Sequence, residues 1–503
     1  MAKLKTLAFA VAAAMTLPAW ADQNLTADLV VVGAGAGGTI AAVEAVEGGL
    51  KTIMLEKNAF AGGAGNFMEG SFAAESFMQK EKGVKLTKTE AFNRMAAYHH
   101  WRVNAPLMKA FVDNSADMVQ WVWDHGVHWK EVKTAWRNND VLTWHIYPKA
   151  GALPSTMVKI FKEKGGQLLL STPAEKLIVE NGKVVGVEAK NGSGEKVTVR
   201  AKNVILATGG YNFNVPMVKE MTGIDMIPVG APGRTGDGVQ MLESAGAKLV
   251  NMNVCMQAGL WLKGVPTDLQ FGKDGVTKAE YVRLLAALFQ PYLKTSLQGE
   301  RVADETLPLE YISNAFEKVG GEGFAVFDDK TREEMIKEGL PRGYFGMVTP
   351  GTKFTNFDAL FERGVKDGFC YKADTLEDLA KMTGMDPARL AATANRMNEL
   401  VKIGKDEDFY KDSEWLREVK TGPFYAIKGS LRTYATTGGA SVNEYFQPLD
   451  EKGNVIKGIY AIGQDGGGLY SDSYDMHIAE GTASSWAICG GKLAVDHIVK
   501  TAK

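Results

Sequence analysis

The sequence predicts an α/β protein, and three observations lead to that prediction. Residues 29–32 are an apolar run that suits a buried strand, and a cluster of glycines follows it directly. Residues 39–46 then have a helical pattern, and residues 52–55 form a second apolar run. A strand, a helix and a strand in this order predict a parallel sheet covered by helices.

The first 21 residues have the three parts of an export signal. Lys3 and Lys5 form a short basic region, residues 6–17 are an apolar run too short to span a bilayer, and Ala19-Trp20-Ala21 supplies a cleavage pattern. Because the segment has no twin-arginine pair, we expect export by the general secretory route and a mature protein that begins at Asp22. The predicted location is the periplasm.

The remaining chain divides into a first domain that is interrupted by a second. Residues 87–165 have a helical pattern, and hairpin-like strands are expected at 167–169, 175–179, 184–189 and 196–200, followed by a buried strand at 204–207. Residues 256–425 lack this pattern and alternate helices with loops. We therefore expect a first domain over 22–255, completed by 426–503, with an α+β domain inserted over 256–425.

Composition excludes several classes of function. Lys and Arg total 57 against 59 for Asp and Glu, so we expect no nucleic-acid partner. No segment after the signal has about 18 consecutive apolar residues, so we expect no membrane span. Cys255, Cys370 and Cys489 form neither a disulfide framework nor a Cys-x-x-Cys-His haem site. The histidines lack a ligand pattern, so no metal is expected.

The glycine cluster matches the dinucleotide-binding pattern GxGxxG. Gly33 permits a tight turn, Gly35 lets the backbone approach a pyrophosphate, and Gly38 allows close packing of helix on strand. The helix N-terminus then faces the phosphates, and Glu56, at the end of the second strand, can accept a hydrogen bond from a ribose hydroxyl. A purely structural glycine turn leaves Glu56 unexplained.

Further glycine turns favour FAD as the dinucleotide. A second glycine loop lies at 62–66, a Thr-Gly-Gly turn at 208–210, a helix start at 235–238, and a strand end at 463–465. The helix after Gly481 can present its N-terminus to the electron-rich end of a flavin. We expect non-covalent FAD to contact Gly33, Gly35, Ala36, Gly37, Gly38, Glu56, Lys57, Gly62, Gly63, Asn66, Gly70, Ala174, Thr208, Gly209, Asp237, Gln464, Asp465, Gly481 and Ala483.

With these motifs in this order, the chain resembles the fumarate reductase and flavocytochrome c flavoprotein family, which also includes urocanate reductase and 3-ketosteroid dehydrogenases. The shared segments are LATGG at 206–210, TGDG at 235–238, GERVADE at 299–305, KADTLEDL at 372–379, TGG at 437–439 and GIYAIG at 458–463. The resemblance covers nearly the whole mature chain. It implies a Rossmann-type, glutathione-reductase-like FAD domain with an inserted capping domain, and a substrate held between the cap and the flavin.

The sequence departs from this family where fumarate would bind. The resemblance implies arginines and histidines around the dicarboxylate and a cap arginine that protonates the alkene. Here Gly259, Ala435 and Ile478 replace expected cations, and no arginine lies between Arg301 and Arg332, where the proton donor belongs. Since two carboxylates in a dry pocket need paired cations, we expect a substrate other than fumarate.

Aromatic and neutral side chains remain near these positions. His477 stands four residues before Gly481, a spacing similar to that of the catalytic tyrosine in 3-ketosteroid dehydrogenases, and histidine suits proton transfer. A structural role for His477 stays open, as does packing for the tyrosines. The tryptophans within 121–144 form either a helix core or the floor of a pocket. The candidate catalytic residues are His477, Tyr434, Tyr470 and Tyr474.

Three functions are compatible with this sequence. The first is a reductase that transfers hydride from flavin to an activated C=C bond of a small molecule, an aromatic or bulky α,β-unsaturated carbonyl compound. Export favours it, since NAD(P)H is not available outside the cytoplasm; electrons would come from a separate c-type cytochrome or a quinol-linked donor, as in anaerobic respiration. The second is the reverse dehydrogenation of a CH–CH bond. The third is a non-catalytic flavoprotein that relays electrons or binds a ligand.

Overall fold

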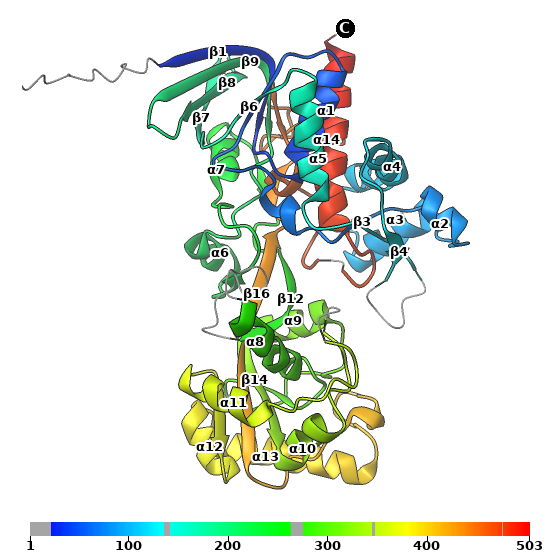
Figure 1. Cartoon of the computed structure of the whole chain (residues 1–503), viewed down its shortest axis with the longest axis vertical. Coiled ribbons are helices and arrows are strands. Elements are labelled where there is room, and N and C mark those ends of the chain that lie inside the picture. Colours follow the sequence, from blue (N-terminus) through cyan, green and yellow to red (C-terminus); the bar gives the residue numbers. More distant parts are fainter. Residues whose placement is uncertain (1–21, 135–140, 263–274, 345–347, 475, 503) are drawn as a thin grey trace, which may run out of the picture.

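The computed structural model describes residues 22–134, 141–262, 275–344, 348–474 and 476–502, so the expected export signal lies outside the described residues. Figure 1 shows two lobes. The upper lobe is built on the sheet that contains the N-terminal strand, and the lower lobe is formed by the inserted segment. The long strand β16 (Phe424–Thr436) runs from one lobe to the other. The fold is mixed α/β, as the sequence predicts.

A seven-stranded sheet forms the centre of the upper lobe, in the order β6–β2–β1–β9–β8–β7 with β18 paired to β9. Strands β6, β2, β1, β9 and β18 run parallel, whereas β7 and β8 add an antiparallel extension. The strands are β1 (Gln23–Val32), β2 (Thr52–Leu55), β6 (Gln167–Leu169), β7 (Ala174–Glu180), β8 (Lys183–Lys190), β9 (Lys196–Leu206) and β18 (Ile459–Ala461).

Three helices stand side by side against this sheet: α1 (Ala36–Glu47), α5 (Ala152–Glu163) and α14 (Thr482–Thr501) (Figure 1). Helices α1 and α14 approach closely because glycine faces the crossing. A Cβ on Gly491 would lie 2.5 Å from the carbonyl oxygen of Gly37, which no side chain tolerates. This packing brings the N-termini of α1 and α14, distant in sequence, to the same end of the sheet.

Parts of the predicted secondary structure are wrong. Residues 167–169 do not form a hairpin, because α5 carries the chain across and β6 pairs in parallel with β2. The strands expected at 196–200 and 204–207 are one strand, β9, which is paired along both edges by β1 and β8. The region 87–165 is not wholly helical, since it contains β4 (Glu131–Lys133) and β5 (Trp144–Ile146).

These two strands form a small sheet with β3 (Gly70–Phe72), in the order β3–β5–β4. Helices α2 (Phe77–Glu81), α3 (Lys88–Tyr98) and α4 (Ala105–Asp124) lie beside it. Helix α4 starts at a defined point because the Asn104 side chain accepts from the Leu107 N–H and proline follows in the first turn. The chain also contains α6 (Val215–Thr222), α7 (Asp237–Ser244) and a three-stranded sheet in the order β11–β17–β19, formed by β11 (Leu249–Val250), β17 (Gly439–Ser441) and β19 (Gly466–Gly467).

The inserted lobe is built on a six-stranded sheet, some of whose strands lie outside residues 256–425. The sheet agrees with the expected α+β cap, although the pattern of helices and loops over 256–425 did not locate its strands. Strand β16 is its centre and pairs with four neighbours, so the sheet depends on contacts between distant segments. The other strands are β10 (Ile227–Pro228), β12 (Cys255–Leu262), β13 (Lys294–Ser296), β14 (Glu322–Asp328) and β15 (Cys370–Ala373). The helices are α8 (Gly275–Leu288), α9 (Leu309–Glu317), α10 (Asp329–Lys337), α11 (Phe357–Lys366), α12 (Leu376–Thr383) and α13 (Pro387–Ile403).

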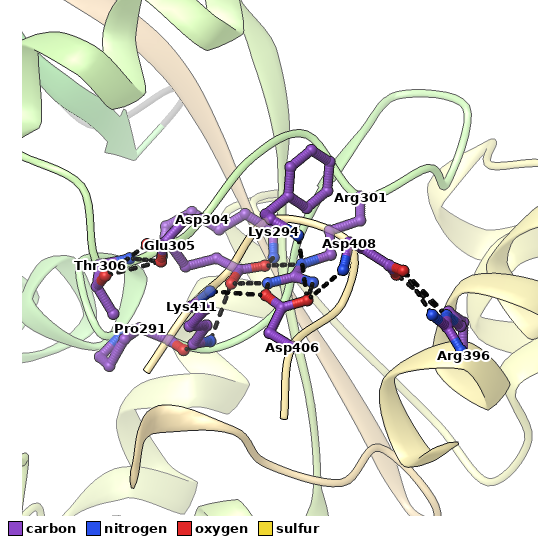
Figure 2. Close-up of polar contacts among 11 residues, drawn as sticks. Pro291, Lys294, Arg301, Asp304, Glu305, Thr306, Arg396, Asp406, Asp408 and Lys411 are labelled. Carbon is purple, nitrogen blue, oxygen red and sulfur yellow. Dashed lines mark hydrogen bonds and ion pairs between the residues drawn. The ribbon is translucent and has the colours of Figure 1, made fainter. Parts of the chain in front are cut away.

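A buried cluster of charges ties two loops of the inserted lobe together (Figure 2). Arg301 donates to both carboxylate oxygens of Glu305, at 2.9 and 3.0 Å, and to both of Asp406, at 3.0 and 2.7 Å. Lys411 donates to Glu305 at 2.9 Å, and Lys294 lies beside them, buried. The family-like segment GERVADE therefore has a structural role, because its arginine and glutamate hold the loop that carries Asp406.

Candidate active site

The glycines of the GxGxxG motif have three different environments. Gly33 has φ +103°, and a Cβ there would lie 2.3 Å from the Ala207 carbonyl oxygen. A Cβ on Gly38 would lie 1.9 Å from the Gly33 carbonyl oxygen, so this glycine permits the contact of α1 with β1. A Cβ on Gly35 would meet only the Gly62 carbonyl oxygen, at 3.9 Å. Gly35 is thus open on the side where a pyrophosphate would approach, and the geometry fits a dinucleotide.

A cavity of about 430 Å³ begins at this motif and ends between the lobes. Most of the residues expected to contact FAD lie on its wall. They are Gly33, Gly35, Ala36, Gly37, Glu56, Lys57, Gly63, Gly70, Ala174, Thr208, Gly209, Asp237, Gln464, Gly481 and Ala483. The fold therefore places residues from distant segments along one cleft: the ends of β1, β2 and β9, the 463–465 turn and the start of α14.

Four of the expected contacts do not line the cavity, and each has another place in the structure. Gly38 lies at the helix–strand contact. Gly62, with φ +116°, donates its N–H to the Ala34 carbonyl at 2.8 Å, and the Asn66 amide donates to the Ala61 carbonyl at 3.2 Å. Gly62 and Asn66 therefore stabilise the second glycine loop through these hydrogen bonds and do not line the cavity. The fourth residue is Asp465.

Asp465 is fully buried and supports the turn after β9. Its carboxylate accepts from the Thr208 main-chain N–H at 2.5 Å, the Thr208 hydroxyl at 2.9 Å and the Gly210 N–H at 3.2 Å. Burial raises the pKa of Asp465 to about 6, although these donors act in the opposite direction. Asp465 therefore lies behind the cavity wall, and its neighbour Gln464 is the residue on the wall.

The polar residues near the motif hold one another in place. Glu56 accepts from the main-chain N–H of Ala34 at 2.9 Å and from the main-chain N–H of Asn58 at 2.8 Å. A carboxylate has about four acceptor positions, so Glu56 can still accept from a ribose hydroxyl. Lys57 donates to Asp237 at 2.6 Å and to Thr235 at 2.7 Å. These contacts prepare the adenosine end of the cleft.

Arg234 also lines the cavity, and the sequence did not point to it. Its guanidinium donates to the carbonyl oxygens of Tyr434 at 2.5 Å, Val229 at 2.8 Å and Ala231 at 3.1 Å. Burial lowers its pKa to about 10. Arg234 thus links the loop that contains Val229 and Ala231 to Tyr434 on β16, and so stabilises this part of the cavity wall.

The end of the cavity nearest the inserted lobe is lined mostly by aromatic and thioether side chains. Tyr434 and Tyr474, two of the expected catalytic residues, lie there, and the Tyr474 hydroxyl accepts from the Ala483 N–H at the start of α14, at 3.2 Å. The other large side chains on this part of the wall are Phe67, Met68, Glu69, Trp144, Met256, Met476 and Glu480. Trp144 therefore does belong to a pocket, whereas Trp129 is buried against Tyr147 and His145.

His477 and Tyr470, the other two expected catalytic residues, are not on the wall. The His477 ring packs edge-on against Tyr311 with centroids 5.8 Å apart, and burial lowers its pKa. Tyr470 is buried between His99 and Tyr474. The spacing of His477 to Gly481 does not place it in the cavity, because the turn before α14 directs Tyr474 and Glu480 there instead.

The fold and this cleft define an FAD-dependent oxidoreductase with a cap over its flavin end. A protein-family model described as "FAD binding domain" matches residues 28–476, so the chain belongs to this family, FAD_binding_2. The vinyl phenol reductase of Lactiplantibacillus plantarum is 32% identical over 481 residues, which cover 93% of this chain and 96% of that protein. The expectation of FAD and of chemistry at C=C or CH–CH bonds is thereby confirmed.

Two solved structures are similar over 95% of the chain. The open conformation of a flavocytochrome c3 fumarate reductase is 25% identical with a TM-score of 0.68, over 79% of that chain. A 3-ketosteroid Δ1-dehydrogenase from Sterolibacterium denitrificans, 19% identical with a TM-score of 0.71 over 100% of that chain, shares the fold. The protein is therefore a flavin-dependent oxidoreductase of the fumarate reductase family. No helix among the described residues is long and apolar enough to cross a membrane.

Proposed function

We propose that this protein reduces the C=C bond of a neutral alkene that is conjugated to an aromatic ring or a carbonyl group. FAD, when bound and reduced, supplies the hydride. The observation that carries the proposal is the charge of the cavity wall: its described residues include four carboxylates (Glu56, Glu69, Asp237 and Glu480) and only two cations (Lys57 and Arg234).

Both cations are already engaged by the protein. Lys57 lies 2.6 Å from a carboxylate oxygen of Asp237, and Arg234 donates to three backbone carbonyls. A substrate carboxylate would therefore meet no unengaged cation on the described cavity wall, at a cost of several kcal/mol. A neutral aromatic group would instead pack against Trp144, Tyr434 and the methionines.

One of the positions where the family resemblance implies a fumarate-binding cation, Gly259, has no room for it here. Gly259 has φ +72°, and a Cβ would lie 2.8 Å from the Phe289 ring and 3.3 Å from the Leu309 side chain. Its N–H donates to the Ser313 hydroxyl at 2.8 Å. Ala435 lies on the cavity wall. Apolar side chains thus surround Gly259, and Ala435 adds no charge to the cavity wall. Both observations support a substrate class other than dicarboxylates.

One relative supports this substrate class. The vinyl phenol reductase is named for an aromatic alkene without a carboxylate, and it matches nearly the full chain. For electron supply, the fumarate reductase of similar structure is a flavocytochrome c3, whereas this chain has no Cys-x-x-Cys-His motif. We propose that a separate cytochrome or quinol-linked protein reduces the flavin outside the cytoplasm, in agreement with the export pattern of residues 1–21.

The test is anaerobic reoxidation of the flavin after reduction by a viologen. 4-Vinylphenol and benzylideneacetone should reoxidise it, whereas cinnamate and fumarate should react about 10²–10³-fold more slowly, since each 1.4 kcal/mol corresponds to a factor of ten. A preference for fumarate contradicts the proposal. Oxidation of saturated ketones with an artificial acceptor, and no alkene reduction, would indicate the dehydrogenase instead. No reaction in either direction would indicate a non-catalytic flavoprotein.

A further inference from the structure

We propose that Glu69 is the acid that gives a proton to the substrate carbon beside the one that receives hydride. This inference rests on the proposed function. It concerns the step that the family resemblance leaves without a residue, because no arginine lies between Arg301 and Arg332 in this chain.

The backbone at Glu69 is held firmly, so its side chain has a defined origin. The Glu69 carbonyl accepts from the Tyr147 N–H at 2.9 Å. The next residue, Gly70, begins β3 and lies against Trp144: a Cβ on Gly70 would be 2.6 Å from the indole nitrogen. Glu69 therefore stands on a rigid edge of the small sheet, on the part of the cavity wall that also includes Trp144 and Tyr434.

The carboxyl group of Glu69 is available for a ligand. Within the described residues no hydrogen bond or ion pair engages it, although the side chain is open to the cavity. The other carboxylates of the wall are occupied: Glu56 accepts from Ala34 and Asn58, and Asp237 binds Lys57. Glu480 accepts from the Thr134 hydroxyl at 3.0 Å.

The charges around Glu69 suit an acid that alternates between two protonation states. The Glu69 side chain is exposed to the open cavity; its partial removal from solvent there raises its pKa, and Lys133 on β4 acts in the opposite direction. In the inserted lobe, the Glu69 charge is among the causes that raise the pKa of the buried Tyr344, after burial of that phenol. Arg432 donates to the Tyr344 hydroxyl at 3.2 Å and lies 4.9 Å from the Tyr434 ring. Glu69 thus shares the cavity wall with Tyr434 of β16, the strand that runs into the inserted lobe.

The proton step balances with groups already named. The π electrons of the C=C bond form a C–H bond with the Glu69 proton as the carboxyl O–H bond breaks, and hydride from reduced FAD completes the saturated product. The carboxylate that remains regains its proton from water, and Lys133 stabilises it meanwhile. A carboxylic acid is a stronger acid than a tyrosine by several orders of magnitude, which favours Glu69 over Tyr434 and Tyr474.

The first part of the test uses the Glu69→Gln variant of the full FAD-containing protein, with Glu131→Gln as the matched control. Glu131 is a neighbouring carboxylate, 3.6 Å from Lys133, that does not line the cavity. We expect Glu69→Gln to retain FAD and to be reduced normally by a viologen. Its reoxidation by 4-vinylphenol should slow by about 10²–10⁴-fold, while binding of the product 4-ethylphenol stays within a few-fold.

The second part does not depend on turnover. In infrared titrations of the oxidised protein, wild type should show a carboxylic C=O band that ionises above the ordinary range for glutamate. The band should be absent in Glu69→Gln, unchanged in Glu131→Gln and shifted to higher pH in Lys133→Met, since that variant removes the cation.

Two results would overturn the assignment while the proposed function stands: reoxidation of Glu69→Gln within about threefold of an active wild type, or a loss of 4-ethylphenol binding as large as the loss of rate. The second result would make Glu69 a binding group for the substrate hydroxyl. A wild type that no neutral alkene reoxidises would overturn the proposed function itself.

Discussion

Asp465 accepts hydrogen bonds from both the main-chain N–H and the hydroxyl of Thr208, although the two residues are 257 positions apart in the sequence. This contact joins the turn at Gly463–Asp465 to the turn that follows β9. A buried carboxylate therefore holds two turns of the flavin cleft together, although it does not line the cavity itself.

At pH 4, Asp465→Asn should destabilise the flavin-free protein by about 1–3 kcal/mol, because an amide N–H2 would face main-chain donors that lose their acceptor. The folded-state pKa of Asp465 is about 6, above its ordinary 3.8, so the folded state binds the proton more tightly. The wild-type contribution is then fully present below about pH 4 and falls as the pH rises toward 6.

Urea unfolding between pH 4 and 7 measures this effect. Wild type should be the more stable protein at pH 4, and its advantage over Asp465→Asn should shrink as the pH rises by an amount on the order of 3 kcal/mol, so that it vanishes or reverses by pH 7. Equal pH dependence in the two proteins would show that Asp465 is not perturbed.

Gly35 and Gly38 should respond differently to substitution. Gly35→Val places its side chain in open space, so the flavin-free protein should keep its melting temperature and lose FAD binding. Gly38→Ala meets the Gly33 carbonyl oxygen, so it should lower the melting temperature even without FAD. Thermal unfolding and flavin absorbance of both variants decide this. If Gly35→Val kept its full FAD content, the pyrophosphate would not bind beside Gly35 as we expect.

The charge cluster of Figure 2 should contain one destabilising lysine. Burial lowers the pKa of Lys294 to about 7, from 10.5. The unfolded chain therefore binds more protons between pH 7 and about 10, and this group's contribution to stability rises over that range. We expect Lys294→Met to be more stable than wild type below pH 7, with the advantage declining above it.

The matched variant Lys411→Met should behave in the opposite way: burial lowers the pKa of Lys411 as well, but its ammonium is paired with a buried carboxylate. Lys411 lies 2.9 Å from Glu305 and is buried with it, so its loss leaves that carboxylate with Arg301 alone. We expect a clear loss of stability in urea at pH 7, by several kcal/mol. Similar stabilities for the two methionine variants would contradict this assignment of roles.

His477→Ala should leave flavin reoxidation within a few-fold of wild type. The spacing of His477 to Gly481 alone predicts a larger effect, but the ring lies against Tyr311 and outside the cavity wall. Stopped-flow reoxidation with 4-vinylphenol measures the rate, and Glu69→Gln supplies the comparison. A loss of 100-fold or more with intact FAD would restore His477 as the proton donor.

The sequence alone determined the features that depend on neighbours along the chain. The strand, the glycines of 33–38 and Glu56 follow one another within a single βαβ unit, so their spacing predicts the dinucleotide site and most of the FAD contacts. The cations missing at Gly259, Ala435 and Ile478 could likewise be predicted, because a charge that is absent from the sequence cannot appear in the fold.

Only the tertiary structure decided which side chains face the cavity. Asp465 and Glu69 are both acidic residues beside glycine turns, yet one is buried under donors from Thr208 and Gly210 and the other is open to the cleft. His477 and Glu480 both lie shortly before α14 in the sequence, but only Glu480 lines the cavity. Burial, pKa and access depend on segments hundreds of residues apart packing together, and no local spacing encodes that contact.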